Sequence, residues 1–214
     1  MSALNALRDE ISTITQRGIG MPMAGMIFWL AFAGFGHAYP PKQASLYAFF
    51  ATGVVFPLGY WLTRLLGGDL FAKGHELNKL GGIFNAVQFF YWPILIAIFS
   101  IRPELVPFVM AVLFGSHFLP YGWFYRAPGY SFLGIGLPLV ATVLQLIWPE
   151  RVFLSIPLAA AGIYLIAVAM VWAQNARDRA ALGERAFVAV NQVSRDSGAF
   201  ESDPYSAPEG SSGS

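Results

Sequence analysis

Long uncharged stretches alternate with short charged segments along most of the chain. Six of them, each of 21 to 25 residues, contain no Asp, Glu, Lys or Arg between Arg17 and Arg177. A helix that crosses a hydrocarbon layer of roughly 30 Å needs about 20 apolar residues. We therefore predict an all-α, polytopic membrane protein with a bundle of six transmembrane helices. The predicted spans lie near 20–38, 45–65, 82–100, 104–124, 130–148 and 152–174.

The segments outside these spans divide the chain into four parts. Residues 1–17 have apolar side chains at helical spacing and predict a short amphipathic helix, which either lies in the membrane interface or docks against the inner ends of the bundle. Residues 18–176 form the predicted bundle. Residues 177–196 continue the last helix into the cytoplasm. Residues 197–214 are small and polar, which predicts disorder, and they end in Ser-Ser-Gly-Ser, which resembles an artificial linker.

The connections between the predicted spans differ in length. The longest, 67–82, has glycine pairs at both ends and an apolar side, which predicts a short interfacial helix between flexible hinges. The connections at 39–44, 101–103 and 149–151 are short. Because short connections join neighbouring elements, we expect helices three to six to form antiparallel hairpins.

Composition and charge support a membrane location and predict an orientation. Hydrophobic residues make up 56% of the chain and charged residues only 12%, against about a quarter in soluble domains. Ten basic residues fall on the side that holds both termini and three on the other side. Cytoplasmic loops are enriched in Lys and Arg, so both termini are expected in the cytoplasm, with a bacterial inner membrane as the expected location. The net charge of +1 gives no reason to expect nucleic-acid binding.

The chain lacks the residues that several classes of chemistry require. The six uncharged stretches contain no carboxylate to relay protons, and the chain contains no cysteine. Neither a His-Glu-x-x-His nor a Gly-x-Ser-x-Gly motif occurs, so nothing favours an enzyme. We expect no cofactor, because His37 and His117 fall in opposite halves of the bilayer and cannot hold one haem. We expect no metal either, and interpret Asp69, His75 and Glu76 as an ordinary solvated loop.

Prolines fall within five of the six predicted spans. The residues are Pro57, Pro93, Pro107, Pro120 or Pro138, and Pro157. Each removes a backbone hydrogen bond and can kink its helix. Hinged helices for alternating access are one interpretation, and the ordinary composition of membrane helices is the other, which we favour.

Polar residues within the third and fourth spans form the one candidate site. They are Asn85, Gln88, Trp92, His117, Tyr121 and Arg126. The first three recur at helical spacing and so share one face of the third helix. Counting residues from the inner ends of the two helices, we expect Gln88 to face His117, and Asn85 to face Tyr121 one turn closer to the cytoplasm.

Such a cluster has two interpretations. The polar groups either hydrogen-bond across helices for packing, or line an inward-open pocket with Arg126 at its mouth favouring anions. The function expected from the pocket is binding or transport of a small polar or anionic solute or of a lipid headgroup. The alternative is a structural or regulatory protein without transport activity, which forms a homo-oligomer or binds partner membrane chains through Ala159–Gly162, Gly34 and Gly36.

Overall fold

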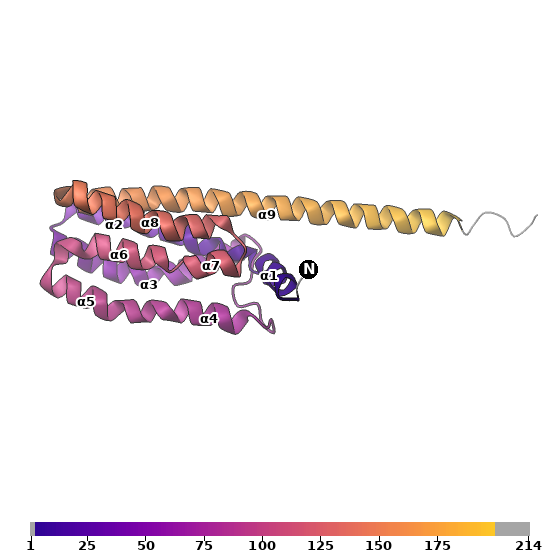
Figure 1. Cartoon of the computed structure of the whole chain (residues 1–214), viewed down its shortest axis with the longest axis horizontal. Helices are drawn as coiled ribbons and strands as arrows, with labels where there is room; N and C mark the ends of the chain where they lie inside the picture. Colours follow the sequence, from indigo (N-terminus) through magenta and orange to yellow (C-terminus); the bar gives the residue numbers. More distant parts are fainter. Residues whose placement is uncertain (1–2, 200–214) are drawn as a thin grey trace, which may run out of the picture. The chain divides into compact units, whose positions relative to one another are not determined.

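The computed structural model of the chain describes residues 3–199, and it is helical apart from turns (Figure 1). Six helical segments are long and apolar enough to cross a membrane, which confirms the predicted helical membrane bundle. These segments are Gln16–Ala38, Pro41–Leu65, Asn78–Ile101, Pro103–Phe124, Pro128–Ile147 and Pro149–Glu184.

Nine α-helices make up the described part of the chain. They are α1 (Ala3–Ile14), α2 (Gly20–Ala38), α3 (Pro41–Leu65), α4 (Asn78–Ala86), α5 (Trp92–Ile101), α6 (Val106–Ser116), α7 (Leu119–Phe124), α8 (Pro128–Ile147) and α9 (Val152–Ala199). One α-helix makes up all or most of spans one, two, five and six: α2, α3, α8 and α9 respectively. The third span consists of α4, a 3₁₀ segment Val87–Tyr91 and α5, and the fourth consists of α6 and α7.

The chain divides into two compact units, Met1–Asn175 and Ala176–Ser214. The first unit holds α1 to α8 and the first part of α9. In the second, the chain remains helical from Ala176 to Ala199. The predicted disorder from residue 197 therefore begins inside a helix, and its remainder, 200–214, lies outside the described residues.

Within the first unit, the connections fall at two ends of the bundle (Figure 1). α1, the loop between α3 and α4 and the turn between α7 and α8 lie at one end, where hydrogen bonds join them. The short connections α2–α3, α5–α6 and α8–α9 lie at the other end. This arrangement is the antiparallel up-and-down topology expected from six spans with short turns.

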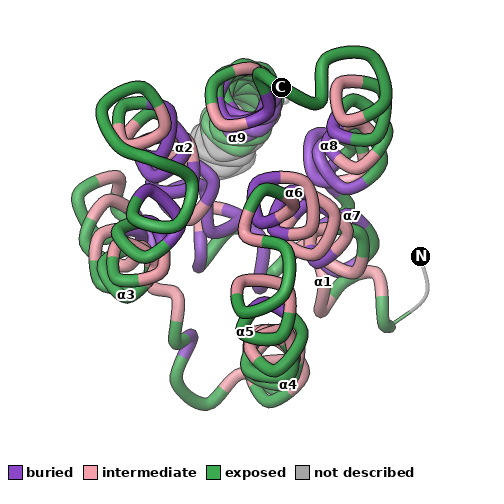
Figure 2. Tube along the Cα trace, turned by 90° about the vertical axis from the view of Figure 1, so that its left-hand side faces the viewer, coloured by how far each residue is buried: buried purple, intermediate pink, exposed green. Residues whose placement is uncertain are grey.

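The core of the first unit forms where α2, α6, α8 and α9 meet, and buried positions face this centre in Figure 2. Trp29, Phe32, Met110, Leu133 and Ile156 have almost no exposed surface. In contrast, α4 contains no buried residue, so the third span lies at the periphery of the bundle.

Small residues bring neighbouring helices close together. A Cβ atom at Gly20 would overlap the carbonyl oxygen of Gly59 on α3, and one at Gly36 would overlap that of Phe153 on α9. Ala160 is also fully buried. Because Gly36 and Ala160 pack within the chain, they are not available as the partner-binding surface that the sequence allowed.

Prolines mark the interruptions in the third and fourth spans. Pro93 and Pro120 each lie in the first turn of the helix that follows an interruption, α5 and α7 respectively. Proline suits a first turn because it has no N–H to donate to the preceding turn. The interruptions themselves fall at Val87–Tyr91 and at His117–Phe118, so both lie beside candidate site residues.

The loop between α3 and α4 differs from its prediction. Residues 66–77 form a series of turns and no helix. Gly81 and Gly82 are not a hinge, because both lie inside α4. A helix in this loop would break the contacts that the turns make, among them the hydrogen bond from the Asp69 amide to the carbonyl of Ile14, at 2.9 Å.

Candidate functional site

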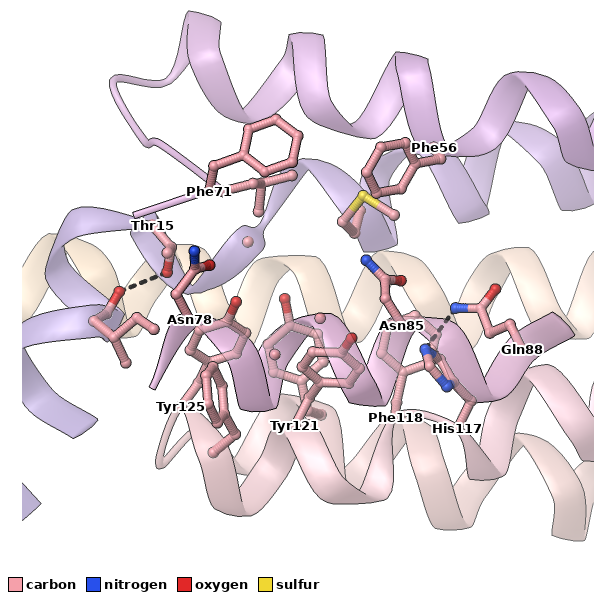
Figure 3. A pocket seen from close by; sticks show the side chains of 18 residues that line it. Thr15, Phe56, Phe71, Asn78, Asn85, Gln88, His117, Phe118, Tyr121 and Tyr125 are labelled. Carbon is pink, nitrogen blue, oxygen red and sulfur yellow. Dashed lines mark hydrogen bonds between the residues drawn. The ribbon is translucent and has the colours of Figure 1, made fainter. Parts of the chain in front are cut away.

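A cavity of about 120 Å³ opens between α3 and α4, near the end of the first unit that carries α1 (Figure 3). Its lining comes from α1, α2, α3, the following loop, α4, the 3₁₀ segment and the stretch from His117 to Tyr130. Eight lining residues have polar side chains: Thr15, Asn78, Asn85, Gln88, His117, Tyr121, Tyr125 and Tyr130. Engineered cavities of ~150 Å³ hold benzene, so there is room for a small molecule.

Gln88 and His117 meet at the deep end of the cavity. Nε2 of Gln88 lies 2.6 Å from Nε2 of His117, and a dashed line marks this hydrogen bond in Figure 3. An amide nitrogen is always a donor, so the imidazole nitrogen must accept and the His117 ring is neutral with its proton on Nδ1. The sequence-based pairing of these two residues is therefore present in the structure.

Asn85 and Tyr121 line the same cavity one turn closer to α1. In Figure 3 the amides of Asn78 and Asn85 project toward Phe71 and Phe56 on the opposite side. The structure thus brings together four of the six predicted site residues, Asn85, Gln88, His117 and Tyr121.

Trp92 lies outside the cavity and packs edge-on against Phe49 of α3, with ring centroids 5.5 Å apart. The predicted common face assumed a continuous α-helix, in which Gln88 and Trp92 differ by only about 40°. The 3₁₀ segment between them has 3.0 residues per turn, which rotates Trp92 to about 120° from Gln88. Asn85 and Gln88 stay aligned because the segment begins only at Val87.

Arg126 does not stand at a mouth of the cavity. Its backbone adopts a left-handed conformation with φ of 51°, and its Nη1 donates to both carboxylate oxygens of Asp9 on α1 at 2.9 Å. Among the described residues that line the cavity, none is Asp, Glu, Lys or Arg. The expected preference for anions therefore loses its basis.

A stack of aromatic rings forms the buried back wall of the cavity. Tyr121 stacks on Tyr125 with centroids 5.8 Å apart, and Phe118 stacks on Tyr130 at 5.6 Å. Tyr125 and Tyr130 are buried. Burial raises the pKa of Tyr125 to about 12, so the Tyr125 hydroxyl keeps its proton.

A left-handed turn between α1 and α2 lies at the end of the cavity beside α1. Gln16, Arg17 and Gly18 all have positive φ, between 51° and 61°, a conformation that costs about 1–2 kcal/mol at a non-glycine residue. The Tyr130 hydroxyl donates to the carbonyl of Arg17 at 2.5 Å, and the Asn175 amide donates to the carbonyl of Gln16 at 3.0 Å. These buried bonds offset the strain and fold α1 back under the bundle.

Contacts along α1 keep it docked. Arg8 lies over the ring of Trp123, 4.4 Å from its centroid, and also donates to the carbonyl oxygen of Trp123. Ser12 donates to the carbonyl of Tyr125 at 3.2 Å, and the side chain of Ile11 is buried against the cavity. α1 therefore packs against α7 and the turn that follows it.

A comparison with protein-family models places residues 4–174 in one family, described as a family of unknown function (DUF7010). The chain belongs to this family. The matched region includes every described residue that lines the cavity, from Ile11 to Tyr130. Neither the curated proteins nor the solved structures give a match.

Four polar lining residues escaped the sequence analysis: Thr15, Asn78, Tyr125 and Tyr130. The i, i+4 spacing of Tyr121 and Tyr125 was a usable signal, because it places both on one face of a helix. Thr15 carried no such signal, since it reaches the cavity only through the left-handed turn. With amides, hydroxyls and a neutral imidazole against aromatic rings, the cavity can hydrogen-bond an uncharged polar group and pack a flat or apolar one.

Proposed function

We propose that this membrane protein binds a small, uncharged polar ligand in the cavity between α3 and α4. The observation that carries the proposal is the Gln88–His117 pair, which lies at the interruptions of two neighbouring spans and opens onto a cavity with six further polar side chains. Non-helical backbone at membrane depth is tolerated where it lines a cavity or is buried in protein. Transporters place their substrate sites at such interrupted helices.

The charges around the cavity favour a neutral ligand. An anion would lose its hydration without meeting a cationic side chain, because Arg126 is engaged by Asp9. A neutral ligand needs only hydrogen bonds, and the Gln88 amide and the Tyr121 hydroxyl each supply both a donor and an acceptor. For the membrane itself, we propose a bacterial inner membrane and cytoplasmic termini, since the basic residues gather at the end of the bundle that carries α1.

A single-cysteine chain provides the test. The protein has no cysteine, so Asn85→Cys introduces one thiol into the cavity. N-ethylmaleimide is uncharged and has two carbonyl acceptors, which makes it a probe of the proposed site. If it binds before it reacts, the alkylation rate at Asn85→Cys saturates with its concentration. At Lys73→Cys, in the exposed loop, the rate should rise linearly.

Two further variants make the result specific. Gln88→Leu, added to Asn85→Cys, should raise the half-saturating concentration about tenfold, equivalent to ~1.4 kcal/mol. The anionic reagent 2-sulfonatoethyl methanethiosulfonate should react readily at Lys73→Cys and slowly at Asn85→Cys. A linear rate at Asn85→Cys in folded protein would refute the binding site. Saturation that survives both Gln88→Leu and His117→Phe would refute the role of the pair.

A further inference from the structure

We infer that the ligand is an uncharged amphiphile, a lipid with a small hydroxyl- or carbonyl-bearing head group, and that it reaches the cavity sideways from the bilayer. The inference rests on the proposed function, since it names the ligand class of the same site. It depends on where the cavity is closed, where it is open and how deep the opening lies.

The cavity is closed toward the cytoplasmic end that we propose. Ile11 and Thr15, at the end of α1, line it there with 2% and 1% of their surface exposed. The salt bridge between Asp9 and Arg126 and the contacts of Arg8 with Trp123 hold α1 in place. A ligand that entered past α1 would have to displace this helix.

On the side between α3 and α4, by contrast, several residues that line the cavity are exposed. Phe56 on α3 and Phe71 in the following loop line the cavity, yet they are 43% and 48% exposed. Gly82 on α4 lines it as well and is exposed, and a Cβ atom there would meet nothing within 4 Å. Figure 3 shows Phe56 and Phe71 across the cavity from Asn78 and Asn85. These residues frame a lateral opening.

The opening extends from the membrane interface into the hydrocarbon layer. Gln88 lies ten residues from the start of α4 at Asn78, which is roughly 15 Å at 1.5 Å per residue. Phe56 lies nine residues from the end of α3 at Leu65, or roughly 14 Å. Counted from Gly82, where the predicted third span begins, Gln88 lies roughly 9 Å deep, which is still inside a hydrocarbon layer of ~30 Å. The neighbouring Ile83 is exposed to the same layer.

A neutral lipid matches this geometry in both of its parts. Its head group would hydrogen-bond with the Gln88 amide and the Tyr121 hydroxyl, while its chain would pass Gly82 and Phe56 into the bilayer. The volume of about 120 Å³ suits a head group of glycerol size and leaves the chain outside. A phosphate in the head group would find no cation among the described lining residues.

Protection of the Asn85→Cys thiol from N-ethylmaleimide tests the ligand class, with the protein in lipid nanodiscs. Three probes share the glycerol group: 1-lauroylglycerol, free glycerol and the anionic 1-lauroylglycerol 3-phosphate. We expect 1-lauroylglycerol alone to slow alkylation, by about tenfold or more. Equal protection by free glycerol would overturn access from the bilayer, and equal protection by the phosphate would overturn the neutral head group.

Blocking the opening tests the route. Gly82→Phe, in the Asn85→Cys chain, should abolish protection by 1-lauroylglycerol and slow alkylation about tenfold. Gly82→Ala leaves the opening wide, and Gly162→Phe places the same ring at another open glycine on α9, so neither should change the rate. Unchanged protection in folded Gly82→Phe would overturn the lateral route. If alkylation by N-ethylmaleimide saturates but 1-lauroylglycerol gives no protection, the lipid is refuted and the proposed function stays intact. If alkylation does not saturate, the proposed function itself is refuted.

Discussion

The hydrogen bond between Gln88 and His117 should contribute measurably to the stability of the bundle. Nε2 of Gln88 donates to His117 at 2.6 Å, and His117 is 6% exposed. Interhelical hydrogen bonds in membrane proteins contribute about 0.6 kcal/mol on average and at most about 1.7 kcal/mol. The short distance and the buried acceptor place this pair in the upper part of that range. Gln88→Leu should therefore lower the free energy of unfolding by about 1 kcal/mol, which corresponds to a Tm lower by roughly 2–4 °C.

A double-mutant cycle isolates the contribution of the pair. Gln88→Leu, His117→Phe and the double variant are unfolded in mixed micelles, with helicity followed by circular dichroism. We expect a coupling energy of about 0.6–1.7 kcal/mol between the two positions. Gln145→Leu makes the same chemical change near the C-terminal end of α8 and serves as the control. Its combination with His117→Phe should be additive within about 0.5 kcal/mol. A coupling energy of zero for Gln88 and His117 would refute the hydrogen bond and the helix registers behind it.

Three further predictions concern the turn, the helix packing and the orientation. Tyr130→Phe removes the donor to the buried carbonyl of Arg17 and should lower the free energy of unfolding by about 1–3 kcal/mol. An unchanged free energy of unfolding would show that the left-handed turn does not depend on this bond. Gly20→Ala forces α2 and α3 apart and should cost about 1–3 kcal/mol, while Gly34→Ala, where the new methyl group meets nothing within 4 Å, should cost far less; equal costs would contradict the close approach at Gly20. Arg151→Cys should react with an impermeant thiol reagent in intact cells and Lys73→Cys should not, and the reverse pattern would invert the proposed orientation.

The sequence predicts the number and approximate limits of the spans because charge and length carry that information directly. It also predicts the pairing of Gln88 with His117, since depth in a membrane follows from counting residues along two helices that share a short turn. It fails for Trp92, because the 3₁₀ segment before Pro93 changes the helical phase. A proline indicates that a helix can be interrupted, but not where or with what period.

The end of the cavity beside α1 depends on contacts between segments that are distant in the sequence. Arg126 is the only basic residue in its turn, which suggested a free guanidinium, yet Asp9 lies next to it once α1 folds back. That fold requires positive φ at Gln16 and Arg17, which neither residue type favours. Tertiary hydrogen bonds from Tyr130 and Asn175 impose this conformation, so local sequence patterns do not reveal it.

A crystal structure grown in a monoacylglycerol mesophase tests the central claim most directly, because the host lipid is itself an uncharged amphiphile with a glycerol head group. The account predicts electron density for one glycerol group within hydrogen-bonding distance of the Gln88 amide and the Tyr121 hydroxyl, with its acyl chain leaving past Gly82 and Phe56. A cavity filled by the side chains of α3 and α4, with the Gln88–His117 bond intact and no lipid density between these helices, would contradict it.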